Sequence, residues 1–113
     1  MKRSDKFFLE DILECIDKIE MYTKDLSYED FVEKQMVIDA VVRNLEVIGE
    51  ASKNIKDDAR KKYSSIPWNR MIGLRNIIAH GYFGVDLSIV WKIITKNLPD
   101  TKSLIVEMYK HLE

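Results

Sequence analysis

Cysteine is almost absent from this sequence of 113 residues, and histidine is nearly as rare. The single cysteine, Cys15, cannot form an internal disulfide. Only His80 and His111 accompany it, so the chain has no Cys and His residues spaced as in a zinc site. We therefore expect no resident metal ion and no cofactor. Free cysteines are commonly buried, and we expect Cys15 to be a small core residue of the first helix.

Long apolar runs are also missing. No stretch approaches the roughly 20 consecutive apolar residues that span a membrane. The first residues, MKRSDKFFLEDILE, carry acids where a signal peptide would have an uninterrupted apolar segment. The sequence thus predicts a cytoplasmic protein that does not associate with a membrane.

Acidic residues are scarce in the middle of the chain. The formal net charge is −1, but the first fifty residues carry 7 Lys and Arg against 13 Asp and Glu, whereas Lys53 to Arg75 carries 7 against 2. A local basic patch can steer a polyanion to one place, although the same charges can simply solvate a short helix. The patch, called the basic island below, consists of Lys53, Lys56, Arg60, Lys61 and Lys62.

What is present is a chain of one-domain size with a helical pattern. With 113 residues, 46% of them hydrophobic, it is large enough for one core, so we expect a single domain over residues 1–113. Apolar residues three and four apart predict a first amphipathic helix of about 20 residues. These residues are Phe8, Ile12, Cys15, Ile16, Ile19 and Tyr22.

A second, long helix is predicted to start after Ser27. Ser27 and Asp30 have the spacing of a capping box, and apolar residues from Phe31 to Ile55 continue in one stripe. A short connection makes the two helices an antiparallel hairpin. A further edge of the long helix has small apolar residues that would permit close approach of another helix. This edge consists of Val37, Ala40, Val47 and Ala51.

The remaining sequence predicts shorter helices and no strand. A third helix is expected at residues 57–63 and a fourth at residues 68–80, with Pro67 at its start. Asp86 is a suitable cap for a fifth helix, and Pro99 is expected to break the chain before a last one. The fold class predicted is therefore all-α, an up-and-down bundle of about five to six helices.

The fourth helix carries a charge where the core is expected. At about 100° per residue, Arg75 points into the middle of an apolar stripe. The stripe consists of Trp68, Met71, Ile72, Ile78 and Ala79. A buried ion without a partner costs several kcal/mol, so Arg75 must face an acid, a solvent-filled cleft, a subunit interface or an anionic ligand. The acids that could pair with it are Glu46 and Glu50 of the second helix.

Two further polar residues border this arginine. Asn76 and His80 are four residues apart and share a helix face next to Arg75, so the three could converge on one cleft. Taken alone, His80 directly before Gly81 is also what an ordinary helix end looks like. Tyr82 alone is also what a half-buried loop aromatic looks like.

The segment RNIIAHGY, which contains these residues, resembles the R-x4-H-x-Y motif of the HEPN superfamily (higher eukaryotes and prokaryotes nucleotide-binding), specifically that of the HepT toxins. The resemblance extends along most of the chain, and no motif position departs from the pattern. Further similar stretches are LSYEDF, RNLEVIGEASKNI, YSSIPWNRMIGLRNIIAHGYFGVD and VWKIITKNLPD.

This resemblance implies a HEPN-like bundle and a metal-independent endoribonuclease that acts as a homodimer, with the motifs of the two subunits meeting at the interface. It also implies the toxin of a type VII toxin–antitoxin system. In such a system the partner, an MntA-type nucleotidyltransferase antitoxin, uses ATP to adenylylate a tyrosine, which by position is Tyr82. Members of this group have also been described as non-catalytic substrate-binding partners of a nucleotidyltransferase, and this is the alternative function.

The residues themselves fit the chemistry of RNA cleavage. Attack by the 2′-hydroxyl requires a base, an acid and a cation; histidine suits both proton transfers, and arginine offers a fork of donors to phosphate. In a two-fold dimer, the two His80 side chains could act as base and acid while the two Arg75 residues neutralise the phosphate. Asn76 would orient His80 or contact the substrate, and an adenylyl group on Tyr82 would add bulk and negative charge at the mouth of the site. The basic island could hold flanking RNA.

Overall fold

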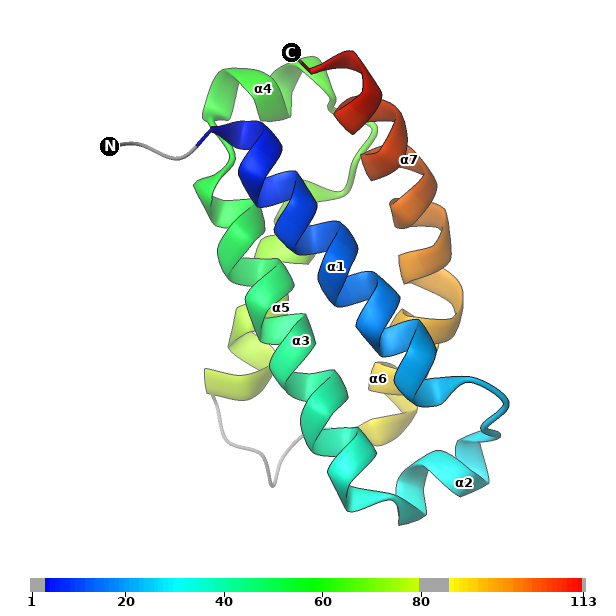
Figure 1. Ribbon diagram of the computed structural model, residues 1–113. Coiled ribbons are helices and arrows are strands. Elements are labelled where there is room, and N and C mark those ends of the chain that lie inside the picture. Colours follow the sequence, from blue (N-terminus) through cyan, green and yellow to red (C-terminus); the bar gives the residue numbers. More distant parts are fainter. Residues whose placement is uncertain (1–3, 80–85, 113) are drawn as a thin grey trace.

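The computed structural model of the chain describes residues 4–79 and 86–112, and within these ranges it contains helices and no strand (Figure 1). The helices are α1 (Asp5–Thr23), α2 (Tyr28–Glu33), α3 (Gln35–Asn54), α4 (Asp57–Lys62), α5 (Trp68–Ala79), α6 (Leu87–Lys92), the π-helical η2 (Ile93–Asn97) and α7 (Leu98–His111). The backbone keeps right-handed helical angles from α6 through η2 into α7, so these three form one continuous rod. The predicted all-α class is confirmed.

Successive long helices run in opposite directions. In Figure 1, α1 descends, α3 rises beside it, α5 descends and α7 rises. Helix α1 packs against α3 and α7, and α3 packs against α5 on its other side. The predicted antiparallel hairpin is the α1–α3 pair, and the up-and-down arrangement is that of a HEPN-like bundle.

Burial of aliphatic side chains between these helices stabilises the bundle. Helix α1 contributes Leu9, Ile12, Ile16 and Ile19, whose exposed fractions are 1% or less. They recur at steps of three and four residues, as an amphipathic helix requires. Cys15 lies in the same core, 6% exposed, which confirms its prediction as a core residue.

The predicted second helix is in fact two helices. Its capping box is confirmed, because the Asp30 N–H donates to the Ser27 hydroxyl and the Ser27 N–H donates to the Asp30 carboxylate, both over 3.1 Å. The helix then stops at Lys34, which has φ −106° and ψ 85°. The bend at Lys34 lets α3 pack along α1 and turns Phe31 inward. Phe31 is fully buried, and its ring centroid lies 5.1 Å from that of Trp91. Tertiary packing thus overrides a continuous helical pattern.

The break expected at Pro99 does not occur. Pro99 lies in the first turn of α7, directly after the π turn, in which the Leu98 N–H donates to the carbonyl of Ile93. Proline has no N–H to donate, and its ring clashes with the carbonyl four residues before it. The wider π turn accommodates it without ending the rod.

The other predicted boundaries agree with the structure. Helix α4 begins at Asp57, and α5 begins at Trp68 directly after Pro67. Asp86 caps α6, because its carboxylate accepts the Ser88 N–H over 2.9 Å. The expected end of the fourth helix at His80 lies outside the described residues.

Candidate active site

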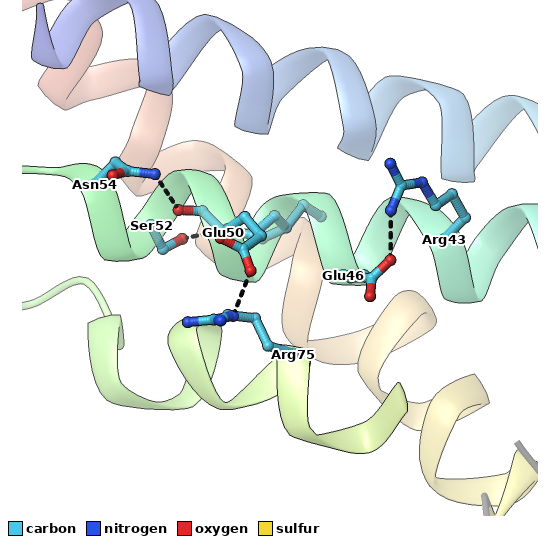
Figure 2. A network of polar contacts seen from close by, with 7 residues as sticks. Arg43, Glu46, Glu50, Ser52, Asn54 and Arg75 are labelled. Atoms are coloured by element: carbon cyan, nitrogen blue, oxygen red, sulfur yellow. Dashed lines mark hydrogen bonds and ion pairs between the residues drawn. The ribbon is translucent and has the colours of Figure 1, made fainter. Parts of the chain in front are cut away.

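Arg75 lies where α5 packs against α3 (Figure 2). Trp68 and Met71, which share its stripe, are buried at 6% and 3% exposure, whereas the Arg75 side chain is 33% exposed. The arginine therefore sits at the rim of the α3–α5 interface and not in the core. The side chains of Ile78 and Ala79, the last members of the predicted stripe, lie outside the described part of the structure.

Glu50 of α3 is the acid that Arg75 meets. The Arg75 Nε lies 2.6 Å from the Glu50 Oε1 (Figure 2). Glu46, the other candidate, bonds Arg43 on its own helix instead. A guanidinium carries five N–H donors, and one carboxylate accepts at most two of them in a fork. The ion pair therefore anchors Arg75 and leaves donors for a phosphate.

Gly49 makes this arrangement possible, and its role was not predicted from the sequence. A Cβ atom placed on Gly49 would lie 2.5 Å from the Arg75 Cγ, 2.9 Å from the Arg75 backbone nitrogen and 3.1 Å from the Met71 carbonyl oxygen. Only glycine allows α3 and α5 to approach this closely. A signal exists in the sequence, since an isolated glycine within a helical pattern usually has a packing reason. The predicted edge of Val37, Ala40, Val47 and Ala51 does not include it.

The rest of the motif is only partly described. Asn76 is exposed on α5, directly after Arg75. Helical spacing puts Asn69 and Ile72 on the same face of α5 as Asn76, so a continuous strip leads from the start of the helix to the motif. His80 and Tyr82 lie outside the described residues, and their part in the site rests on the sequence.

The lysines of the basic island are spread over three places. Lys53 lies in the last turn of α3 and Lys56 directly before α4, both exposed. The Lys62 Nζ lies 5.8 Å from the ring centroid of Tyr63, a distance typical of a cation–π contact. These three side chains are placed as solvated surface cations are.

Arg60 and Lys61 differ from the others because they share one acid. The Lys61 Nζ lies 3.1 Å from one carboxylate oxygen of Asp57, and the Arg60 Nη2 lies 3.8 Å from the other. A single negative charge thus faces two positive ones. Arg60 and Lys61 therefore form a pair around Asp57, in which the other three cations of the basic island take no part.

Two other kinds of chemistry find no support in the described residues. Burial raises the pKa of the Cys15 thiol to about 11, so the thiol stays neutral at physiological pH and is a poor nucleophile. Across residues 4–79 and 86–112 no three Cys, His, Asp or Glu side chains group closely enough to hold a metal ion.

Within the same ranges, no helix has both the length and the apolar character needed to span a bilayer.

Comparison with known proteins places the chain in a family. A family model described as Ribonuclease HepT-like matches residues 12–108. A candidate RNase of Methanocaldococcus jannaschii is 46% identical over 101 residues, which are 89% of this chain and 93% of that protein. A probable ribonuclease HepT of Thermococcus cleftensis is 43% identical over 110 residues, which are 97% of this chain and all of that protein. No solved structure gives a significant match.

Proposed function

The chain belongs to the HepT-like ribonuclease family, and from this we propose that it is a metal-independent endoribonuclease, the toxin of a type VII toxin–antitoxin system acting in the cytoplasm. The observation that carries the proposal is the state of Arg75. Its guanidinium lies on a partly exposed surface, is fixed by Glu50 and keeps donors for an anion. The R-x4-H-x-Y motif begins at this residue.

The reaction would be a transesterification within the RNA. A base removes the proton of a 2′-hydroxyl, and the oxygen then attacks the adjacent phosphorus. The bond from phosphorus to the 5′-oxygen breaks, and an acid gives that oxygen a proton. The products are a 2′,3′-cyclic phosphate and a 5′-hydroxyl end. Arg75 would stabilise the charge on the phosphorane, since a preorganised cation acts where negative charge develops.

A homodimer would complete the site. Each chain provides one motif histidine, His80, and a two-fold axis would bring two of them to one phosphate as base and acid. The Arg75–Glu50 pair lies at the outer rim of the α3–α5 interface, where a second subunit could approach it. Asn76, exposed beside Arg75, would orient His80 or contact the RNA.

Regulation would act through Tyr82. A partner nucleotidyltransferase of the MntA type would transfer an adenylyl group from ATP to the tyrosine oxygen, with release of pyrophosphate. The added group is bulky and carries a negative phosphate, two residues beyond the histidine that must approach RNA phosphate. Like-charge repulsion would then exclude the substrate. The cations of the basic island, the exposed Lys53, Lys56, Lys61 and Lys62 and the half-buried Arg60, would contact flanking RNA.

The test is cleavage in the absence of metal ions. We would incubate protein whose Tyr82 is shown by mass to be unmodified with labelled tRNA and mRNA in EDTA, and analyse the ends. The His80→Ala variant should lose cleavage. The matched control is His111→Ala, which removes the only other histidine, an exposed residue near the end of α7 whose Nε2 lies 3.0 Å from Glu107. This control should cleave as the parent does.

Each outcome decides between two functions. Cleavage by the parent and by the control, with cyclic or 3′-phosphate ends, supports the ribonuclease. Absence of cleavage by all three would overturn it in favour of a non-catalytic, substrate-binding subunit of a two-component nucleotidyltransferase. In that case Arg75 and His80 should instead be needed for association with the nucleotidyltransferase.

A further inference from the structure

A pocket of about 430 Å³ lies at the corner between α4 and the start of α5. Its polar lining comes from Asp57, Arg60, Lys61, Ser64, Asn69 and Arg70. Three cations therefore line it together with one acid, and that acid is already shared by two of them. The third cation, Arg70, makes no ion pair within the described residues. This net positive charge favours an anionic ligand.

Arg60 supplies loosely held donors to the lining of this α4–α5 pocket. Its Nε is buried and has no hydrogen-bond partner among residues 4–79 and 86–112, and its Nη2 reaches Asp57 only over 3.8 Å. The Nε is too enclosed for a ligand in the pocket to reach. The Arg60 side chain as a whole is 26% exposed, however, and its loosely held Nη groups remain as donors for an anion.

The start of α5 adds two further donors. The first backbone bond of this helix runs from the Met71 N–H to the Pro67 carbonyl over 3.0 Å. Asn69 and Arg70, which line the pocket, precede Met71, and no acceptor is found for their backbone N–H groups in the described part of the chain. The N-terminus of a 12-residue helix also carries a partial positive charge.

Trp68 indicates which part of a nucleotide the pocket would take. The indole is only 6% exposed, and its Nε1–H donates to the Tyr63 carbonyl over 3.1 Å. Trp68 therefore packs as part of the pocket wall, and its ring is not free for a base to stack on. The available groups are charged or N–H donors, which suit phosphate oxygens.

We propose that the α4–α5 pocket binds a phosphate group, and that in the ribonuclease proposed above it holds a backbone phosphate of the RNA strand beside the cleavage point. This second half rests on the proposed function. Asn69 and Asn76 lie seven residues apart on one helix face, a separation of about 10 Å. One RNA strand along α5 could therefore reach both the pocket and Arg75.

The first experiment needs no cleavage. Inorganic phosphate is titrated into the ¹⁵N-labelled protein, and the amide signals of Asn69 and Arg70 and the Nε–H signal of Arg60 are followed. Saturable shifts are expected at all three, and the double variant Arg60→Gln/Arg70→Gln should weaken phosphate binding at least about tenfold, as loss of two charged donors predicts. Should that variant unfold, Lys61→Gln/Arg70→Gln replaces it with the same expectation.

The matched control is Lys92→Gln/Lys96→Gln, which removes the same charge from exposed cations that do not line the pocket. It should retain phosphate binding. Absence of saturable shifts in the parent would overturn the proposal that the pocket binds phosphate. An equal loss of binding in the control would overturn it too, because net charge alone would then explain the data.

A second experiment separates the possible sources of the phosphate. Binding of a 2′-O-methyl oligonucleotide, which cannot be cleaved, is measured against salt concentration, with adenosine monophosphate in parallel. If RNA is the source, Arg60→Gln/Arg70→Gln should flatten the slope of log K against log salt by about 0.7 for each phosphate that the variant no longer neutralises. An unchanged slope, together with adenosine monophosphate binding that the variant loses, would overturn the RNA assignment in favour of a free nucleotide. Phosphate binding without RNA cleavage would refute the proposed ribonuclease activity but not the proposed phosphate site.

Discussion

Arg75 combines a packed aliphatic stem with a charged group at the rim of the α3–α5 interface. Its Cγ fills the space beside Gly49, so the aliphatic stem packs against α3, while the guanidinium reaches the partly exposed Glu50. Long cationic side chains commonly bury the stem and keep the charge at the surface. This division explains how a charge can occupy an apolar stripe without a full desolvation penalty.

The ion pair gives the first prediction. Glu50→Gln keeps the shape but removes the charge that orients Arg75, so RNA cleavage should fall by about tenfold, because misplacing a catalytic group weakens transition-state contacts. The free energy of unfolding should change by about 1 kcal/mol or less, since both side chains are partly exposed. Steady-state cleavage rates and urea unfolding measure the two effects.

The control for this prediction lies one turn earlier on the same helix. Glu46→Gln removes an equal charge from a carboxylate that bonds Arg43 and not Arg75. It should leave cleavage unchanged. If both variants lose activity equally, the effect comes from surface charge and the positioning role of Glu50 is wrong.

Cys15 gives a prediction about pH. Burial raises the pKa of its thiol to about 11 in the folded chain, against 9.0 when it is exposed. The folded state therefore holds its proton more tightly, and stability that is fully present below pH 9 is lost as the pH rises from 9 to 11. The loss amounts to about 2–3 kcal/mol. Denaturant unfolding of the parent and of Cys15→Val across this range should show a flatter pH dependence in the variant; parallel curves would contradict it.

At the scale of elements, the contact between α3 and α5 depends on glycine at one position. Gly49→Ala would place a methyl group against backbone atoms of Arg75 and Met71, which cannot rotate away. We expect a net loss of about 1–2 kcal/mol, because the cost of overpacking exceeds the gain in helix propensity. Thermal or urea unfolding measures this loss of stability. The variant should also lose RNA cleavage, because Arg75 is displaced.

Gly73 provides the matched control on α5 itself. A Cβ atom there meets nothing within 4 Å. Gly73→Ala should therefore raise the free energy of unfolding by about 0.5–1 kcal/mol through helix propensity alone. Two identical substitutions should thus have opposite signs, and a destabilising Gly73→Ala would show that space at the backbone is not what distinguishes the two sites.

Local signals determined most element boundaries, and long-range packing determined the exceptions. The capping box at Ser27, the cap at Asp86 and the start of α5 after Pro67 are written within a few residues of sequence. The bend at Lys34 is not, because it exists to bury Phe31 against a residue sixty positions away. The π turn before Pro99 is a backbone adjustment that side-chain periodicity does not record.

At the scale of the whole molecule, the composite site predicts that activity depends on assembly. If two subunits share one site, the specific cleavage activity should fall on dilution in step with the dimer fraction, since the monomer holds only half of the catalytic groups. Analytical ultracentrifugation and activity over the same concentration range provide the comparison. A monomer with undiminished specific activity would refute the shared site.

The sequence by itself determined the helical class and the hairpin of the first two long helices, because periodicity and caps are local properties of the chain. The roles of Arg75, Asn76, His80 and Tyr82 stay predictions from the motif. Only the tertiary structure decided that Arg75 pairs with Glu50 and not Glu46. It also decided that Gly49 sets the distance between α3 and α5, and that Arg60 and Arg70 line one pocket. These facts depend on how separate helices pack against one another, and a pattern within one helix does not contain that geometry.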